Sequence, residues 1–150
     1  MKVEIKNYKR FNGHDGQGFE ATLYIDGIRA CLISDDGWGG EWNWDILPKG
    51  DKVTIEFWEK CKALPQIKFE YGDGEFSMLD MCPEIWIEDN LLQIADQKVQ
   101  CRGKVLIMED GKFYTMGKWD AKFAELIETM IHVRHPNAQL INGKPVMATI

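Results

Sequence analysis

The feature that most constrains the fold is Asp26-Gly27, which lies between two runs with the periodicity of β-strands. Residues 19–25 alternate apolar and polar side chains, as a strand with one buried face does, and residues 28–33 form a second apolar run. An Asp-Gly pair between such runs predicts a tight hairpin, because its turn requires positive φ. Residues 3–6 alternate in the same way. We therefore predict that the chain begins with an antiparallel β-meander.

Two segments in the middle of the chain carry signals of helices. Residues 51–64 fit both the helical and the strand period, and Pro65, which would stop a helix, favours the helix. A second helix is predicted to begin near Pro83, because proline is tolerated in the first turn. The side chains that this second helix is predicted to bury are Ile87, Leu91, Ile94 and Ala95.

A third helix is predicted from about Trp119 to Val133, before Pro136. Apolar residues at spacings of three and four form one face of this helix, which we expect to be buried. The members of this face are Trp119, Phe123, Leu126, Ile127 and Met130.

The remaining segments contain turns. Asp110-Gly111 predicts a second β-hairpin near residues 104–116. Residues 67–76 are predicted to form a loop or a weak strand pair, and residues 34–50 show no regular period. A short strand or turn is expected around residues 140–143.

The composition agrees with one folded domain. The order of elements contains no repeat or linker and predicts a single α+β domain over residues 1–150, with the meander packed with about three helices. A net charge of −6 argues against direct binding of nucleic acid. No apolar run approaches the roughly 20 residues that span a bilayer, and residues 1–10 lack an apolar signal core. We expect a cytoplasmic protein that binds no membrane.

The cysteines and histidines do not predict a metal site. The four cysteines are spread through the chain without a C-x-x-C pair, whereas zinc sites usually contain close pairs. His132 and His135 could join Cys82 and Cys101 in a tetrahedral site. Their place at the end of a predicted helix favours interaction with the carbonyl dipole instead. We expect free thiols, no metal and no cofactor.

The meander predicts where the glycine-rich loops lie. In an up-down-up meander, the loops at residues 12–18 and 34–44 emerge at the same end of the sheet, opposite Asp26-Gly27. Loops held by a rigid scaffold often carry function. The candidate binding residues on these loops are His14, Asp15, Asp35, Asp36, Gly37, Trp38, Gly39, Gly40, Glu41, Trp42 and Trp44.

The composition of the second loop indicates what it would bind. Three of the six tryptophans lie within seven positions, and residues 34–45 contain four acids but no Lys or Arg. Carboxylates and indole faces suit a cationic, amide-bearing or sugar-like ligand. The alternative is a structural turn whose tryptophans fold back onto the core.

Two other interpretations stay open. His14-Asp15 and Asp35-Asp36 could bind or hydrolyse a small ligand such as a nucleotide signal, although adjacent residues of an extended chain point in opposite directions. The chain has none of the common catalytic motifs, which makes an enzyme the less favoured interpretation. The acids between Glu70 and Asp89, with no Lys or Arg among them, could imitate a nucleic-acid backbone. A solvated loop and helix start is the simpler interpretation.

Several short motifs together resemble an uncharacterised group of small accessory proteins of phages, prophages and plasmids. The shared features are an N-terminal hairpin followed by a D-G-x-G-G loop, a later hairpin and a C-terminal tail. In this chain they are Tyr24-Ile25-Asp26-Gly27, Asp36-Gly37-x-Gly39-Gly40, Ala63-Leu64-Pro65, Lys104-Val105-Leu106, Asp110-Gly111-Lys112-Phe113-Tyr114, His135-Pro136-Asn137-Ala138 and Leu140-Ile141-Asn142. The resemblance covers most of the chain, implies no catalytic residue, and does not extend to the tryptophan-rich stretch at residues 41–44.

The resemblance implies a binding role, because accessory phage proteins of this size often block a host component. We therefore predict a non-enzymatic inhibitor of a host defence or replication component, which acts in the host-cell cytoplasm. Its contact surface would be the paired loops His14–Gly18 and Asp35–Trp44, where indole rings supply binding area. The expected partner is a host protein or a small ligand, and the sequence leaves the oligomeric state open.

Overall fold

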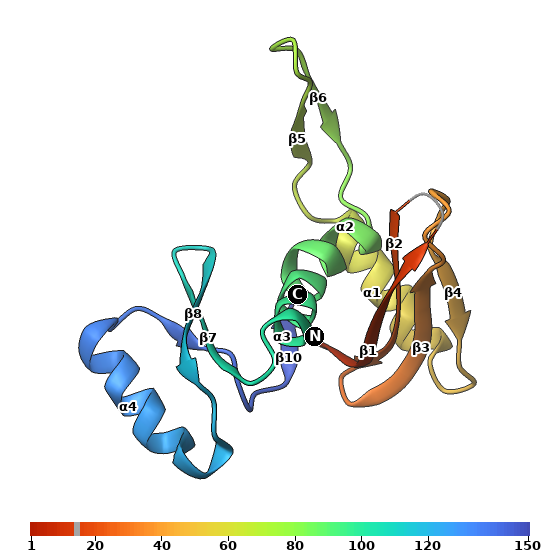
Figure 1. Cartoon of the computed structure of the whole chain (residues 1–150). Coiled ribbons are helices and arrows are strands. Elements are labelled where there is room, and N and C mark those ends of the chain that lie inside the picture. Colours follow the sequence, from red (N-terminus) through yellow and green to blue (C-terminus); the bar gives the residue numbers. More distant parts are fainter. Residues whose placement is uncertain (14–15) are drawn as a thin grey trace. The chain divides into compact units, whose positions relative to one another are not determined.

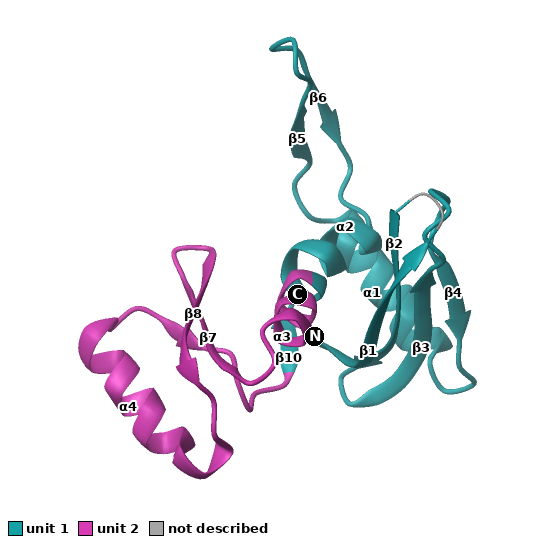
Figure 2. Cartoon of the chain, in the orientation of Figure 1, with its two compact units in different colours: residues 1–92, 146–150 teal, residues 93–145 magenta. Residues whose placement is uncertain are grey.

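A computed structural model describes residues 1–13 and 16–150 and shows an α+β fold, which confirms the predicted class (Figure 1). The chain divides into two compact units, which Figure 2 distinguishes by colour. Unit 1 comprises residues 1–92 and 146–150, and unit 2 comprises residues 93–145. The single domain expected from the sequence stays a prediction.

The described residues of unit 1 form an antiparallel five-stranded sheet in the order β10-β1-β2-β3-β4. The strands are β1 (Lys2–Gly13), β2 (Gly16–Ile25), β3 (Ile28–Asp35), β4 (Asn43–Ile46) and β10 (Val146–Thr149). The predicted meander is confirmed in β1–β3. Asp26 and Gly27 have φ of 48° and 80°, as the tight turn between β2 and β3 requires.

Helices cover the inner face of this sheet. They are α1 (Asp51–Lys62), α2 (Pro83–Ile87) and the π-helical turn η1 (Glu88–Leu92), and the last of these leads into α3 (Gln93–Gln100) of unit 2. The predicted helix over residues 51–64 is confirmed, and its fully buried side chains include Phe57 and Cys61. Ile87, Leu91 and Ala95 are buried as predicted, and Ile94 is half-buried.

Strand β4 corrects the prediction that residues 34–50 form no regular element. Its register places Trp44 opposite Ile33, whose side chain is in the core, and Asp45 opposite Leu32 on the outer face. The period of two extends over only four residues here and follows a glycine-rich loop, so it is too short to recognise in the sequence.

Residues 67–79 form a hairpin of β5 (Ile67–Glu70) and β6 (Phe76–Leu79), which is the strand-pair alternative predicted for this segment. Among the described residues, β5 and β6 pair only with each other. In Figure 1 this hairpin projects beyond α1 and α2 of the same unit.

Within residues 93–145, α3 is followed by a three-stranded sheet in the order β8-β7-β9 and by helix α4. The elements are β7 (Lys104–Glu109), β8 (Lys112–Lys118), the short 3-10 helix η2 (Ala121–Phe123), α4 (Ala124–Arg134) and β9 (Gln139–Leu140). The predicted hairpin at Asp110-Gly111 is confirmed. Ile131 of α4 packs with Val105, Ile107 and Leu140 in the core of this unit.

The buried face predicted for the last helix is confirmed only in part, because Trp119 and Ile127 pack against the core of unit 2 but the other three members are exposed. Four apolar side chains on this helical segment are 55% to 77% exposed, and three of them belong to the predicted face. They are Phe123, Leu126, Met130 and Val133. The helix packs through Ile127 of the predicted face and through Ile131, because α4 is apolar on more than one side and the small sheet covers only one of them.

Candidate functional site

The two glycine-rich loops of the meander meet backbone to backbone at one end of the sheet. A Cβ atom on Gly13 would lie 2.5 Å from the Cα of Gly37, and one on Gly37 would lie 2.7 Å from the Cα of Gly13. Both distances are shorter than real Cβ contacts, and Gly37 has φ of 76°. Only glycine fits this approach without moving the backbone. The loops therefore lie together, as the up-down-up topology predicts.

We call this surface the rim and define it as Gly13, residues 16–18 and residues 35–42. Its predicted members Gly39, Gly40 and Glu41 are exposed. The predictions for His14 and Asp15 lie outside the described residues.

The two adjacent carboxylates of the rim hold its turn. Oδ1 of Asp35 accepts the backbone N–H of Gly37 at 2.9 Å, and Oδ1 of Asp36 accepts that of Trp38 at 2.9 Å. These are Asx turns, in which a short acidic side chain replaces a backbone acceptor two residues before the donor. Each carboxylate therefore has a structural role, and the two are fixed by different amides.

The three clustered tryptophans have different environments. Trp38 is 62% exposed on the rim. Trp42 is half-buried and meets Phe19 edge to face, with 4.9 Å between ring centroids. Trp44 is half-buried in β4, packs edge to face on Trp58 at 5.4 Å, and donates its indole N–H to Glu84 at 2.8 Å. Trp42 and Trp44 thus fold back onto the core, whereas Trp38 presents its indole to solvent.

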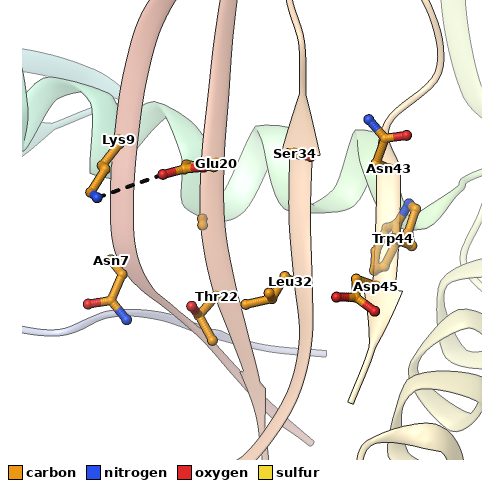
Figure 3. Close-up of a pocket in the computed structure, with 10 residues that line it drawn as sticks. Asn7, Lys9, Glu20, Thr22, Leu32, Ser34, Asn43, Trp44 and Asp45 are labelled. Atoms are coloured by element: carbon orange, nitrogen blue, oxygen red, sulfur yellow. Dashed lines mark ion pairs between the residues drawn. The ribbon is translucent and has the colours of Figure 1, made fainter.

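A polar hollow on the outer face of the sheet adjoins the rim (Figure 3). Its volume is about 470 Å³, which is within the range of small-molecule sites. Ser34 and Asn43, which flank the rim loop, belong to its wall. The lining residues are Asn7, Lys9, Glu20, Ala21, Thr22, Leu32, Ser34, Asn43, Trp44 and Asp45.

A β-bulge shapes this hollow. Lys6 pairs with Thr22 and Lys9 pairs with Glu20, so three steps along β1 match two steps along β2. The extra residue brings Asn7 into the left-handed region with φ of 55°, and such bulges bend a strand and increase its twist. Thr22, which pairs with Lys6 at the edge of the bulge, is only 4% exposed.

The hollow offers hydrogen bonds, and its lining includes three charged residues, Lys9, Glu20 and Asp45. Lys9 and Glu20 form an ion pair at 3.7 Å across the two strands (Figure 3). The amides of Asn7 and Asn43 and the hydroxyls of the lining add donors and acceptors. The sequence does not predict this site, because residues 43–46 are too few to be recognised as a strand. The polar positions that alternate with apolar ones in residues 19–25 are the signal that could have indicated it.

The thiols of unit 1 are unreactive in character. Burial raises the pKa of Cys31 to about 11 and that of Cys61 to about 12, and it also raises the pKa of Cys82. A thiol attacks only as the thiolate, so the fully buried Cys31 and Cys61 behave as small core side chains. Among residues 1–13 and 16–150, no three His, Cys, Asp or Glu side chains are grouped to hold a metal ion.

The acidic residues between Glu70 and Asp89 differ in their exposure and in their contacts. Glu70, Asp73 and Glu75 are exposed on the β5–β6 hairpin. Glu84 is half-buried and accepts the hydrogen bond from the Trp44 indole. Imitation of a nucleic-acid backbone by this segment stays a prediction.

Comparisons with known proteins assign no family. A scan against family models found no match, and searches of curated proteins and of solved structures also found none. In the described part of the chain, no helix is both long enough and apolar enough to cross a membrane.

Proposed function

We propose that this chain is a non-enzymatic binding protein of a phage or another mobile element, which inhibits a host defence or replication component by occupying it. The contact surface is the rim. The observation that carries the proposal is the 62% exposure of the Trp38 indole on a loop whose backbone is fixed by a second loop. Aromatic side chains dominate many binding surfaces, and a preformed loop loses little conformational freedom on binding.

The carboxylates of the rim support binding rather than acid–base catalysis. Asp35 and Asp36 already accept backbone N–H groups of their own loop, so neither is placed as one member of a converging acid pair. With no Lys or Arg in residues 34–45, the rim selects a partner that presents cations or amide donors around an apolar pocket.

Affinity capture from infected host cells, followed by native mass spectrometry of the eluate, tests this proposal. We expect Trp38→Ala to reduce recovery of the partner at least about tenfold, as loss of a central aromatic contact does. The melting temperature of this variant should equal that of the unchanged chain. Tyr114→Ala, which removes an exposed aromatic ring of unit 2, is the matched control and should keep full recovery. Equal recovery with Trp38→Ala would overturn the proposal.

A second candidate function, binding of a small polar ligand, is favoured by the hollow on the outer face of the sheet. Its volume of about 470 Å³ and its amide and hydroxyl lining suit an amide-bearing or sugar-like molecule. Native mass spectrometry of the protein captured from cells would detect such a molecule as added mass. We expect Asn43→Leu to abolish this added mass and Trp38→Ala to preserve it. The reverse result would place the small ligand on the rim.

A further inference from the structure

The β5–β6 hairpin exposes large apolar side chains on both of its faces. We call residues 66–80 the arm, because Gln66 donates to Asp80 at 2.6 Å and so closes its base. Five large apolar side chains of the arm are 39% to 56% exposed. Phe76 and Met78 lie on one face, and Phe69, Tyr71 and Leu79 lie on the other. A two-stranded hairpin is only marginally stable alone in water, so a surface that covers the arm would stabilise it.

The arm is also strongly acidic. It carries Lys68 against Glu70, Asp73, Glu75 and Asp80, a net charge of −3. Lys68 is already engaged within the arm, where its Nζ lies 3.1 Å from Glu70 and 4.4 Å from the centre of the Phe76 ring. The covering surface therefore needs to be apolar with cations at its edge.

Unit 2 of the same sequence carries a surface of this kind. Between β8 and α4 lies an apolar groove of about 210 Å³, lined by Val105, Met116, Gly117, Ile127, Met130, Ile131, Arg134 and His135. This volume is below the roughly 300–1,000 Å³ of small-molecule sites, and fits side chains rather than a free ligand. Met130 joins the groove to the exposed apolar stripe of α4, which the helix does not use for its own packing.

The charge of this region is complementary to that of the arm. Residues 93–145 carry eight Lys and Arg against six Asp and Glu, a net charge of +2. Arg134 lines the groove, and Lys104 and Lys118 line a second hollow that shares Met116 and Gly117 with it. Within this groove the imidazole of His135 already pairs with a carboxylate, since its Nδ1 lies 3.2 Å from Glu109. The acids of the arm thus meet more cations than anions there.

We propose that the chain associates with a second copy of itself, and that the arm of each copy seats its aromatic side chains in the groove and on the α4 stripe of the other. This interface is separate from the rim and does not depend on the proposed function. Two arms would repel each other, because each carries a charge of −3, so the arm pairs with unit 2 of the other copy and not with its arm. Reciprocal exchange gives two equal junctions in each dimer.

Sedimentation equilibrium of the full chain tests this proposal. We expect a monomer–dimer equilibrium that Phe69→Ser with Phe76→Ser in the arm, or Met130→Glu in the groove, weakens at least about tenfold. Ile55→Ser removes an equally exposed apolar side chain of α1 and is the matched control, which should dimerise as the unchanged chain does. Circular dichroism should show that all variants keep their fold, because every substituted side chain is exposed.

A mixing experiment separates this arrangement from other dimers. The arm variant and the groove variant each dimerise only weakly alone, but their mixture keeps one intact junction, between the normal arm of one and the normal groove of the other. We therefore expect a heterodimer of intermediate affinity. A chain that stays monomeric at all concentrations, or a dimer that neither variant weakens, would overturn the proposal. Trp38→Ala should dimerise normally, so failure of the rim proposal and failure of this one are distinguishable.

Discussion

The meander and the arm consist of the same kind of element but differ in what covers them. In β2, Phe19, Leu23 and Ile25 are buried in the core of unit 1, and the outer face is largely polar. In β5 and β6, apolar side chains occupy both faces and stay exposed. The comparison teaches that strand pattern and turn chemistry decide the local structure, whereas the packing partner decides whether an apolar face becomes core or binding surface.

The largest expected difference between the two regions is in their response to alkaline pH. Cys31 on β3 and Cys61 on α1 are buried, with pKa values raised to about 11 and about 12. The folded chain keeps these thiols protonated at a pH where the unfolded chain ionises them. Their stabilising contribution is therefore complete below about pH 9 and is lost as the pH rises through 11 to 12.

Denaturant titrations between pH 8 and pH 11 measure this effect. Above about pH 9, each thiol should lower the free energy of unfolding by about 1.4 kcal/mol per pH unit. Cys61→Ala removes one of the two thiols and should therefore remove its contribution to the change in the free energy of unfolding per pH unit. A free energy of unfolding that does not change between pH 9 and pH 11 would contradict the burial of both thiols.

The second-largest difference is expected when a glycine next to the meander and a glycine in the arm are each replaced by alanine. A Cβ atom on Gly50 would lie 2.6 Å from the carbonyl carbon of Ala30 and 2.7 Å from its Cα, whereas one on Gly72 meets no atom within 4 Å. We expect Gly50→Ala to lower the free energy of unfolding by about 3 kcal/mol, because both contacts are with backbone. Gly72→Ala should change it by less than about 0.5 kcal/mol. Equal effects in urea denaturation would contradict the close approach.

Replacing an aromatic side chain by alanine should also destabilise the large sheet more than the arm, but by a smaller amount. Trp44 loses its packing on Trp58 and its hydrogen bond to Glu84 in Trp44→Ala, at a cost of about 2 kcal/mol because the side chain is half-buried. Phe69→Ala on the arm should cost less than about 0.5 kcal/mol at protein concentrations where the chain is monomeric. Thermal denaturation compares the two variants, and a larger loss for Phe69→Ala would show that the arm is part of the core.

The smallest effect on stability should come from the rim itself. Trp38→Ala should change the free energy of unfolding by less than about 0.5 kcal/mol, because most of the indole is exposed. Asp35→Ala, which removes the acceptor for the Gly37 amide, should cost about 1 kcal/mol. Urea denaturation measures both changes. A loss of several kcal/mol for Trp38→Ala would favour the structural-turn interpretation of the loop.

The meander and the meeting of its loops could be predicted because both follow from local rules. Asp26-Gly27 sets the turn, alternation sets the faces, and an antiparallel order sets which loops share an end. Trp38, Trp42 and Trp44 could not be separated in this way. Their exposure depends on the register of β4 against β3 and on Phe19, Trp58 and Glu84, which come from distant parts of the chain.

The face of the last helix could not be predicted for a related reason. Apolar residues at spacings of three and four identify a stripe but not the surface that covers it. Ile127 lies within the predicted stripe and packs, whereas Leu126 and Met130 beside it stay exposed, because the small sheet of unit 2 covers one side of α4 only. The hollow on the outer face of the large sheet depends likewise on the bulge at Asn7, which the alternation of residues 3–6 does not indicate.

Amide hydrogen exchange of the chain, alone and bound to its captured partner, tests the use of the rim most directly. The account predicts that peptides covering residues 35–42 exchange more slowly in the complex, while peptides from β7 and β8 are unchanged. Protection confined to the arm or to unit 2, with residues 35–42 exchanging as they do in the free chain, would contradict it.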